Sequence, residues 1–137
     1  VGADADHDAD GSQRQLNVLW NDTDALSDSS DWQVVTNFIK APGYYDGTAV
    51  EMKGLDRYEH LAAALRQTNG VVADKSAAMD LLASVGKEQG INVQVTSVSN
   101  TNTIHSVVYD LTDRSVLWVG NEHYGEDGYT FEFQLGA

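Results

Sequence analysis

The aspartates near the N-terminus have the spacing of a calcium-binding loop. Oxygen-bearing side chains occupy the first, third, fifth and seventh ligand positions of such a loop, at Asp6, Asp8, Asp10 and Ser12. Gly11 fits the sharp turn, but the twelfth position is Asn17, where a bidentate Glu is required. No helix is predicted beside the segment. We therefore interpret it as an acidic solvated linker and predict no metal site and no cofactor.

The histidines offer little further chemistry, because no two of them stand at metal-ligand spacing, such as four apart on a helix. They are His7, His60, His105 and His123. His60 falls on a predicted helix, where a surface histidine is the usual case. His105 precedes Ser106 and lies five residues before Asp110, which suggests a catalytic triad. Consecutive strand residues point to opposite faces, so we predict no triad here.

Two helices are predicted in the middle of the chain. Apolar residues recur at helical spacing in 55–67, at Leu55, Tyr58, Leu61, Ala62 and Leu65. Gly54 can cap the start of this helix, and Asn69-Gly70 ends it. A second apolar stripe predicts a helix over 75–89. Asp74 or Ser76 can cap its start, and Gly90 its end.

The rest of the chain has the composition of strands and loops. Alternating or β-branched runs predict four consecutive strands at 91–99, 103–111, 115–122 and 129–135, with a hairpin loop at 111–114. Two earlier runs, 16–20 and 32–39, also read as strands. Consecutive strands favour antiparallel pairing. The sequence therefore predicts an α+β fold with a mostly antiparallel sheet and two helices on one face.

Charge and composition divide the chain and limit its partners. Of the 137 residues 42% are hydrophobic, which suits one folded core, and the net charge is −13. Residues 1–31 carry eight Asp and one Arg, so we predict an acidic linker or edge segment there and the folded domain over 32–137. An acidic surface repels phosphate, so we expect neither a nucleic acid nor a membrane as partner. The chain has no Cys, and hence no disulfide or thiol nucleophile.

Two stretches resemble a known enzyme family. The first runs from W-Q-V-V-T-N-F to G-L-D-R-Y-E-H-L, and the second is the hairpin T-I-H-S-V-V-Y-D-L-T-D-R-S-V-L-W-V, followed by Y-T-F-E-F. In this order they resemble the C-terminal part of linear amide C–N hydrolases: choloylglycine hydrolases, penicillin V acylases, isopenicillin N acyltransferases and acid-ceramidase relatives. The resemblance covers about residues 32–135. The spacing from V-T-N to the Arg is closer to the acyltransferase branch.

The resemblance implies a fold, a reaction and two site residues. The family has an αββα sandwich of the N-terminal-nucleophile (Ntn) hydrolases, in which an N-terminal cysteine attacks the amide and its own α-amine serves as base. Asn37 matches the position whose side-chain amide stabilises the oxyanion. Arg57 matches the arginine near the nucleophile, where a cation lowers the pKa of a thiol. The substrate would be a small-molecule amide.

The chain also departs from the family pattern. It has no cysteine, Val1 is no nucleophile, and Gly54 stands where the family has a Ser at the start of the S-x-x-R helix. His105 stands where an aromatic residue is common. An active enzyme would therefore need an N-terminal half from outside this chain, and we expect the chain by itself to be inactive.

Two other function classes stay open from the sequence. The Asp-rich start and three tryptophans suit a calcium-dependent or ligand-binding extracellular module. A catalytically degenerate interaction domain is the other class. Part of a two-layer sandwich would expose core surface, so such a chain could pair with itself as a homo-oligomer.

Overall fold

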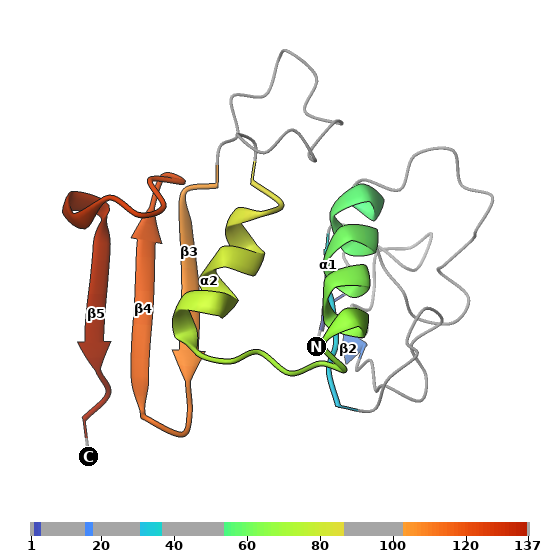
Figure 1. Cartoon of the computed structure of the whole chain (residues 1–137), viewed down its shortest axis with the longest axis horizontal. Coiled ribbons are helices and arrows are strands. Elements are labelled where there is room, and N and C mark those ends of the chain that lie inside the picture. The colour runs from blue at the N-terminus through green and yellow to red at the C-terminus, as the bar shows by residue number, and fades with distance from the viewer. Residues whose placement is uncertain (1, 4–15, 18–30, 37–53, 87–102, 137) are drawn as a thin grey trace, which may run out of the picture. The chain divides into compact units, whose positions relative to one another are not determined.

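The computed structural model describes five segments of the chain: residues 2–3, 16–17, 31–36, 54–86 and 103–136 (Figure 1). The chain divides into two compact units, Val1–Met52 and Lys53–Ala137, and each is described by itself. Predictions for other segments, including the strand at 91–99, lie outside the described residues.

The first unit contains one short antiparallel pairing. Strand β1 (Gly2–Ala3) pairs with β2 (Leu16–Asn17). Both strands lie within the predicted linker or edge segment, residues 1–31. Residues 32–36, from the predicted strand 32–39, are not assigned as strand, although Val34 is buried. Strand propensity depends on the packing context, so a β-branched run does not by itself fix a strand.

Helix α1 (Leu55–Gln67) has the predicted bounds. Gly54 precedes it with φ 89°, and its carbonyl accepts the Tyr58 N–H at 2.9 Å. Only glycine adopts this left-handed conformation without a steric cost. Gly54 therefore starts the helix through its backbone conformation, with no side-chain cap.

The end of α1 is a Schellman motif. Asn69 and Gly70 both have positive φ, at 52° and 76°. The Gly70 N–H donates to the Leu65 carbonyl at 2.7 Å, and the Asn69 N–H donates to the Arg66 carbonyl at 3.2 Å. These two bonds satisfy carbonyls that the helix would otherwise leave open. The predicted stop at Asn69-Gly70 is confirmed.

Helix α2 (Lys75–Ala83) begins where predicted and ends earlier than predicted. The Asp74 carboxylate accepts the Ala77 N–H at 2.8 Å, which makes Asp74 the N-cap. After Ala83 the chain tightens, because the Gly86 N–H donates to the Ala83 carbonyl three residues back. Tightening of this kind is common where an α-helix ends.

The sheet contains three antiparallel strands in sequence order: β3 (His105–Asp110), β4 (Ser115–Gly120) and β5 (Thr130–Gln134). The predicted hairpin between β3 and β4 is confirmed. The Asp110 carboxylate holds its turn by accepting the backbone N–H groups of Thr112 and Asp113, at 2.9 and 3.0 Å. Arg114 closes the turn with φ 51°.

One helix packs against this sheet. Helix α2 contacts β3 and β4, and Figure 1 shows it lying across β3. Met79 of α2 and Val119 of β4 are buried. The ring of His60 on α1 is hydrogen-bonded to Ser84 at the end of α2, at 3.1 Å. The described residues of the second unit thus form two helices and a three-stranded antiparallel sheet, an α+β arrangement.

Asp74→Ala should destabilise the chain by about 0.5–2 kcal/mol, because it removes the side-chain cap of α2. The urea midpoint of unfolding measures this loss. Ser76→Ala is the matched control, two residues further on and exposed, and should leave the midpoint nearly unchanged. Equal midpoints for Asp74→Ala and the unmodified chain would contradict the assigned cap.

Candidate functional site

The structure describes only one of the two site residues that the family resemblance implies. Asn37 lies outside the described residues. Arg57 is in the first turn of α1, with its side chain half-buried and its Nε atom shielded from solvent. Its backbone N–H donates to the Asp56 carboxylate at 2.8 Å. The structure therefore fixes the local setting of Arg57 and leaves its relation to Asn37 as a prediction.

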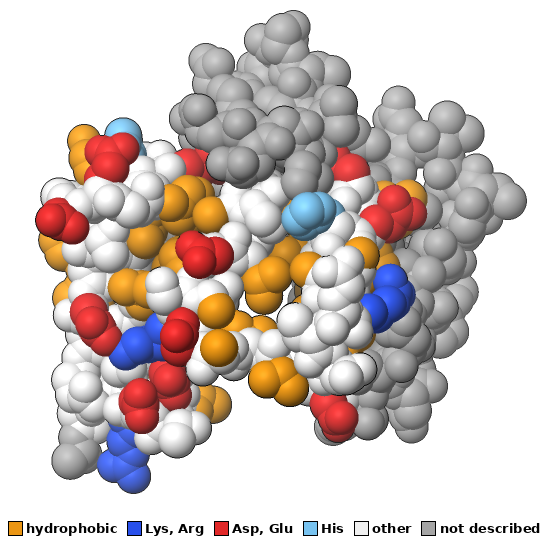
Figure 2. All heavy atoms as spheres, viewed as in Figure 1, with side chains coloured by type: hydrophobic (Ala, Val, Ile, Leu, Met, Phe, Trp, Pro, Cys, Tyr) orange, Lys and Arg blue, Asp and Glu red, His pale blue; other side chains and the backbone are white. Residues whose placement is uncertain are grey.

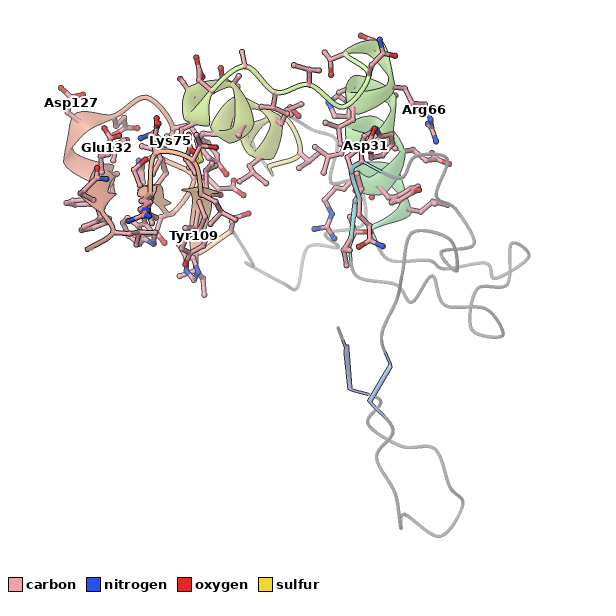
Figure 3. All side chains as sticks on the ribbon, turned by 90° about the horizontal axis from the view of Figure 1, so that it is seen from below. Asp31, Arg66, Lys75, Tyr109, Asp127 and Glu132 are labelled. Atoms are coloured by element: carbon pink, nitrogen blue, oxygen red, sulfur yellow. The ribbon has the colours of Figure 1, made fainter. Side chains whose placement is uncertain are left out.

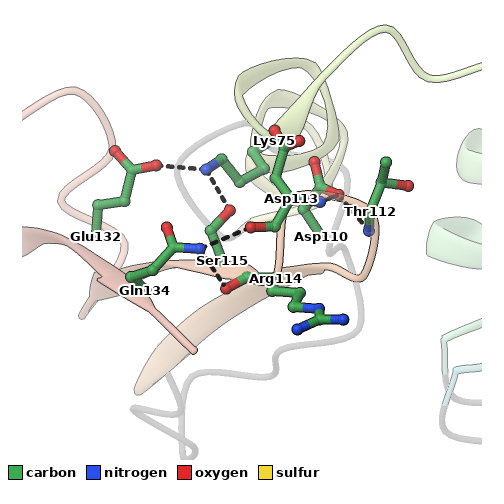
Figure 4. A network of polar contacts seen from close by, with 8 residues as sticks. All are labelled: Lys75, Asp110, Thr112, Asp113, Arg114, Ser115, Glu132 and Gln134. Carbon is green, nitrogen blue, oxygen red and sulfur yellow. Dashed lines mark hydrogen bonds and ion pairs between the residues drawn. The ribbon is translucent and has the colours of Figure 1, made fainter. Parts of the chain in front are cut away.

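A serine and a lysine meet beneath α2. Lys75 Nζ donates to Ser115 Oγ at 2.5 Å and also pairs with the Glu132 carboxylate (Figure 4). Ser115 is 2% exposed, whereas the Glu132 side chain is 62% exposed. The three residues come from α2, β4 and β5, so the contact ties the helix to two strands.

A lysine beside a serine can act as a general base, but only when its pKa is low enough for the neutral amine to form. The hydrogen bond to Glu132 instead raises the pKa of Lys75 above 10.5, and the charges of Asp110 and Asp113 act in the same direction. These effects outweigh the desolvation that lowers it. Lys75 therefore favours its ammonium form, in which it donates a hydrogen bond to Ser115.

The hairpin is also held to the last strand. Gln134 donates from Nε2 to the carbonyl oxygens of Asp113 and Arg114, at 2.7 and 3.1 Å (Figure 4). The Leu135 N–H donates to the same Arg114 carbonyl at 2.7 Å. These bonds satisfy carbonyls of the turn, which fixes the register at this end of the sheet.

His105, Ser106 and Asp110 form no triad. Ser106 is buried and shares a hydrogen bond of 2.7 Å with the Tyr124 hydroxyl. His105 lies on the opposite face, where its ring stacks near Trp118 with centroids 6.3 Å apart. Burial raises the pKa of Tyr124, although its bond to Ser106 acts in the opposite direction. The predicted separation of His105 from Ser106 is confirmed.

The sheet face opposite α2 is apolar and largely exposed, although Val116 within it is buried. Side chains alternate between the two faces along each paired strand. Every second residue of β3, β4 and β5 therefore lies on this face. We call it the aromatic face, and its members are His105, Val107, Tyr109, Val116, Trp118, Phe131 and Phe133. Figure 3 shows Tyr109 projecting away from α2 and Lys75 on the α2 side. The alternation of Phe131 and Phe133 was visible in the sequence, but their exposure was not.

The rings of the aromatic face run across the three strands. Trp118 lies tilted against Phe131 at 5.4 Å between centroids, and Phe131 stacks near Phe133 at 6.5 Å. A Cβ atom added to Gly120 would lie 3.0 Å from the Trp118 ring, so the indole lies over this glycine. The absence of a side chain at Gly120 thus lets Trp118 lean toward His105, the cross-strand partner of Gly120.

A second polar cluster lies in the loop between β4 and β5. His123 Nδ1 is 3.0 Å from a Glu126 carboxylate oxygen, and its ring stacks on Tyr129 with centroids 3.8 Å apart. This is an exposed pair on one loop. Within the described segments, no three His, Cys, Asp or Glu residues are grouped as metal ligands, and no helix is long and apolar enough to cross a bilayer. The calcium-like segment starting at Asp6 lies outside the described residues, apart from Leu16 and Asn17.

Comparison of the chain with protein-family models, with curated proteins and with solved structures found no match.

Sequence reasoning missed the contact of Lys75 with Ser115 and Glu132. The only available signal was the position of Lys75 at the first residue of a predicted helix, with Glu132 in a predicted strand. The residues are 40 and 57 positions from Lys75, so nothing local in the sequence pairs them. Tertiary packing alone brings them together.

The stability of the chain should fall at alkaline pH, in part through Lys75. The folded state favours the ammonium form of Lys75. The stability that Lys75 contributes is therefore fully present below pH 10.5 and is lost as the pH rises through its raised pKa. Lys75→Met should lower the urea midpoint at neutral pH and make the alkaline decline shallower. Glu132→Gln should likewise make it shallower, because it removes the main cause of the shift.

Tyr124 supplies a control for this measurement. Its raised pKa causes a separate loss of stability, which begins near pH 10.0 and continues in the Lys75→Met variant. Tyr124→Phe should remove the loss of stability caused by Tyr124 and keep the loss caused by Lys75. An unchanged alkaline decline in Lys75→Met would show that the ion pair contributes nothing to stability.

Proposed function

We propose that this chain is the C-terminal part of a linear amide C–N hydrolase of the choloylglycine hydrolase and penicillin V acylase type. The observation that carries the proposal is the ordered set of family-like segments, from V-T-N through the helix with Arg57 to the β3–β4 hairpin. The nucleophilic cysteine would lie outside this chain. The isolated chain would then be inactive, as the absence of any Cys requires.

The arrangement of α2 and the sheet is compatible with this proposal. A four-layer αββα sandwich needs a sheet covered by helices on one face and open to a second sheet on the other. Helix α2 packs on one face, and the aromatic face is open on the other. The finer fold, with both helices in one outer layer of such a sandwich, is part of the proposal.

The start of α1 also fits the proposal despite its departure from the family pattern. Gly54 replaces the usual Ser, and its left-handed φ would strain any other residue. Its carbonyl nevertheless accepts the Tyr58 N–H, so the helix begins at Leu55, two residues before Arg57, without a serine cap. The missing serine therefore does not displace Arg57 from the first helical turn.

Each residue would have a defined role in the reaction. The cysteine α-amine takes the thiol proton, the sulfur attacks the amide carbon, and the C–N bond breaks as the amine leaves with that proton. Water then hydrolyses the thioester. The Asn37 side-chain amide would donate to the oxyanion in both halves of the reaction. Arg57 would favour the thiolate by lowering the thiol pKa.

A second candidate is an interaction domain without catalysis. The observation that favours it is the aromatic face, since contiguous exposed apolar surface marks binding surfaces. This candidate needs neither Asn37 nor Arg57. The two proposals therefore differ in the effect of substitutions at those residues.

The proposal is tested by cloning the chain together with the coding region upstream of Val1 and assaying linear amide hydrolysis. Asn37→Ala should lower kcat by about 10²–10³-fold, the usual cost of losing one oxyanion donor. Arg57→Ala should lower the rate and shift the acidic limb of the pH–rate profile upward, because less thiolate forms at low pH.

Arg66→Ala is the matched control, because Arg66 is an exposed arginine in the last turn of the same helix. It should leave both the rate and the pH profile unchanged. The proposal fails if the upstream region encodes no cysteine, or if the Asn37→Ala and Arg57→Ala enzymes keep full activity.

A further inference from the structure

The aromatic face exposes more apolar surface than single scattered residues would. Tyr109, Phe131 and Phe133 are 64%, 45% and 51% exposed, and the adjoining Leu135 is 38% exposed. Together these exposed fractions amount to about two whole side chains, or roughly 400 Å² at about 150–250 Å² for each aromatic residue. The largest apolar patch on a typical monomer covers about 300–600 Å² and is often functional, and the aromatic face falls in this range.

Charge is absent from this face, although the chain is strongly acidic. The net charge is −13, yet no Asp, Glu, Lys or Arg occupies a strand position on the aromatic face. The carboxylates of the paired strands, Asp110 and Glu132, alternate to the face that α2 covers. Figure 2 looks onto the α2 side and shows acidic side chains spread over it. Two acidic chains can therefore meet at the aromatic face without opposing carboxylates at the paired strand positions.

We propose that the aromatic face binds a second copy of this chain, sheet against sheet. Two such patches would bury roughly 800 Å² from the four most exposed side chains alone, and His105, Val107 and Trp118 bring the total near the ~1,000 Å² of a weak specific interface. A twofold contact uses the same patch on both copies. The pair would have the layer order α2, sheet, sheet, α2. This proposal does not rest on the proposed function, and it concerns the chain by itself, because the second sheet of the proposed enzyme would cover the same face.

Sedimentation velocity of the full chain over a range of concentrations tests the pairing. The mass should rise with concentration from one chain toward two. Added salt should strengthen the association, because it screens the repulsion between two copies of charge −13 while the uncharged contact itself is unaffected. An interface held by ion pairs would weaken in salt instead.

Substitutions separate the aromatic face from other exposed apolar residues. Phe131→Thr combined with Phe133→Thr should weaken pairing by roughly tenfold or more, since buried aromatic residues dominate interface energies. Tyr109→Thr on β3 is an independent variant, in case the double change unfolds β5. Leu111→Thr is the control, because Leu111 is 81% exposed but lies in the hairpin turn, outside the paired strand positions that define the face.

Circular dichroism establishes that each variant is folded before its mass is measured. The proposal holds if the variants on the aromatic face sediment as one chain under conditions where the Leu111→Thr variant sediments as two. A folded unmodified chain that sediments as one chain at every concentration and salt would overturn it. So would a dimer that survives both the Tyr109→Thr and the Phe131→Thr, Phe133→Thr substitutions.

Discussion

The register of β4 between its two neighbours is the constraint on which the rest of this unit depends. Val119 pairs with Ser106 on one side and with Thr130 on the other, and the remaining pairs follow from these. Because side chains alternate along a strand, a slip of one residue would exchange the two faces of the sheet. The present register places Ser115 and Val119 on the buried face and Trp118 on the open one.

The buried face shows why a constellation that resembles a catalytic pair need not be one. Ser115 and Lys75 have the distance of a serine–lysine dyad, but Glu132 holds the lysine in its charged form. A catalytic lysine is desolvated away from such partners. The same three groups instead connect α2 to the strands beneath it, at the position where the helix begins.

The open face and the first helix bear on function in different ways. The aromatic face leaves rings exposed to water, and a surface that covered it would gain free energy by burying them. In the proposed enzyme, Arg57 would act on a cysteine nucleophile, which this chain does not contain. A chain that pairs through its sheet and an enzyme that closes the same sheet internally would use one surface for the same physical reason.

The sequence by itself determined the local elements whose signals lie within a few residues. Helical periodicity with Gly54 and Asn69-Gly70 gave both ends of α1, and Asp74 gave the start of α2. Alternation and turn residues gave the antiparallel strands, since these signals act within one turn or one hairpin.

Only the tertiary structure decided which face of the sheet α2 covers and which groups meet across long separations. Phe131 and Phe133 alternate as core residues do, yet they are exposed, because α2 lies on the other face. Lys75 finds Ser115 and Glu132 only when the helix is laid across the strands. Side-chain alternation fixes two faces but not which one is buried, and that choice is made by packing between elements distant in the chain.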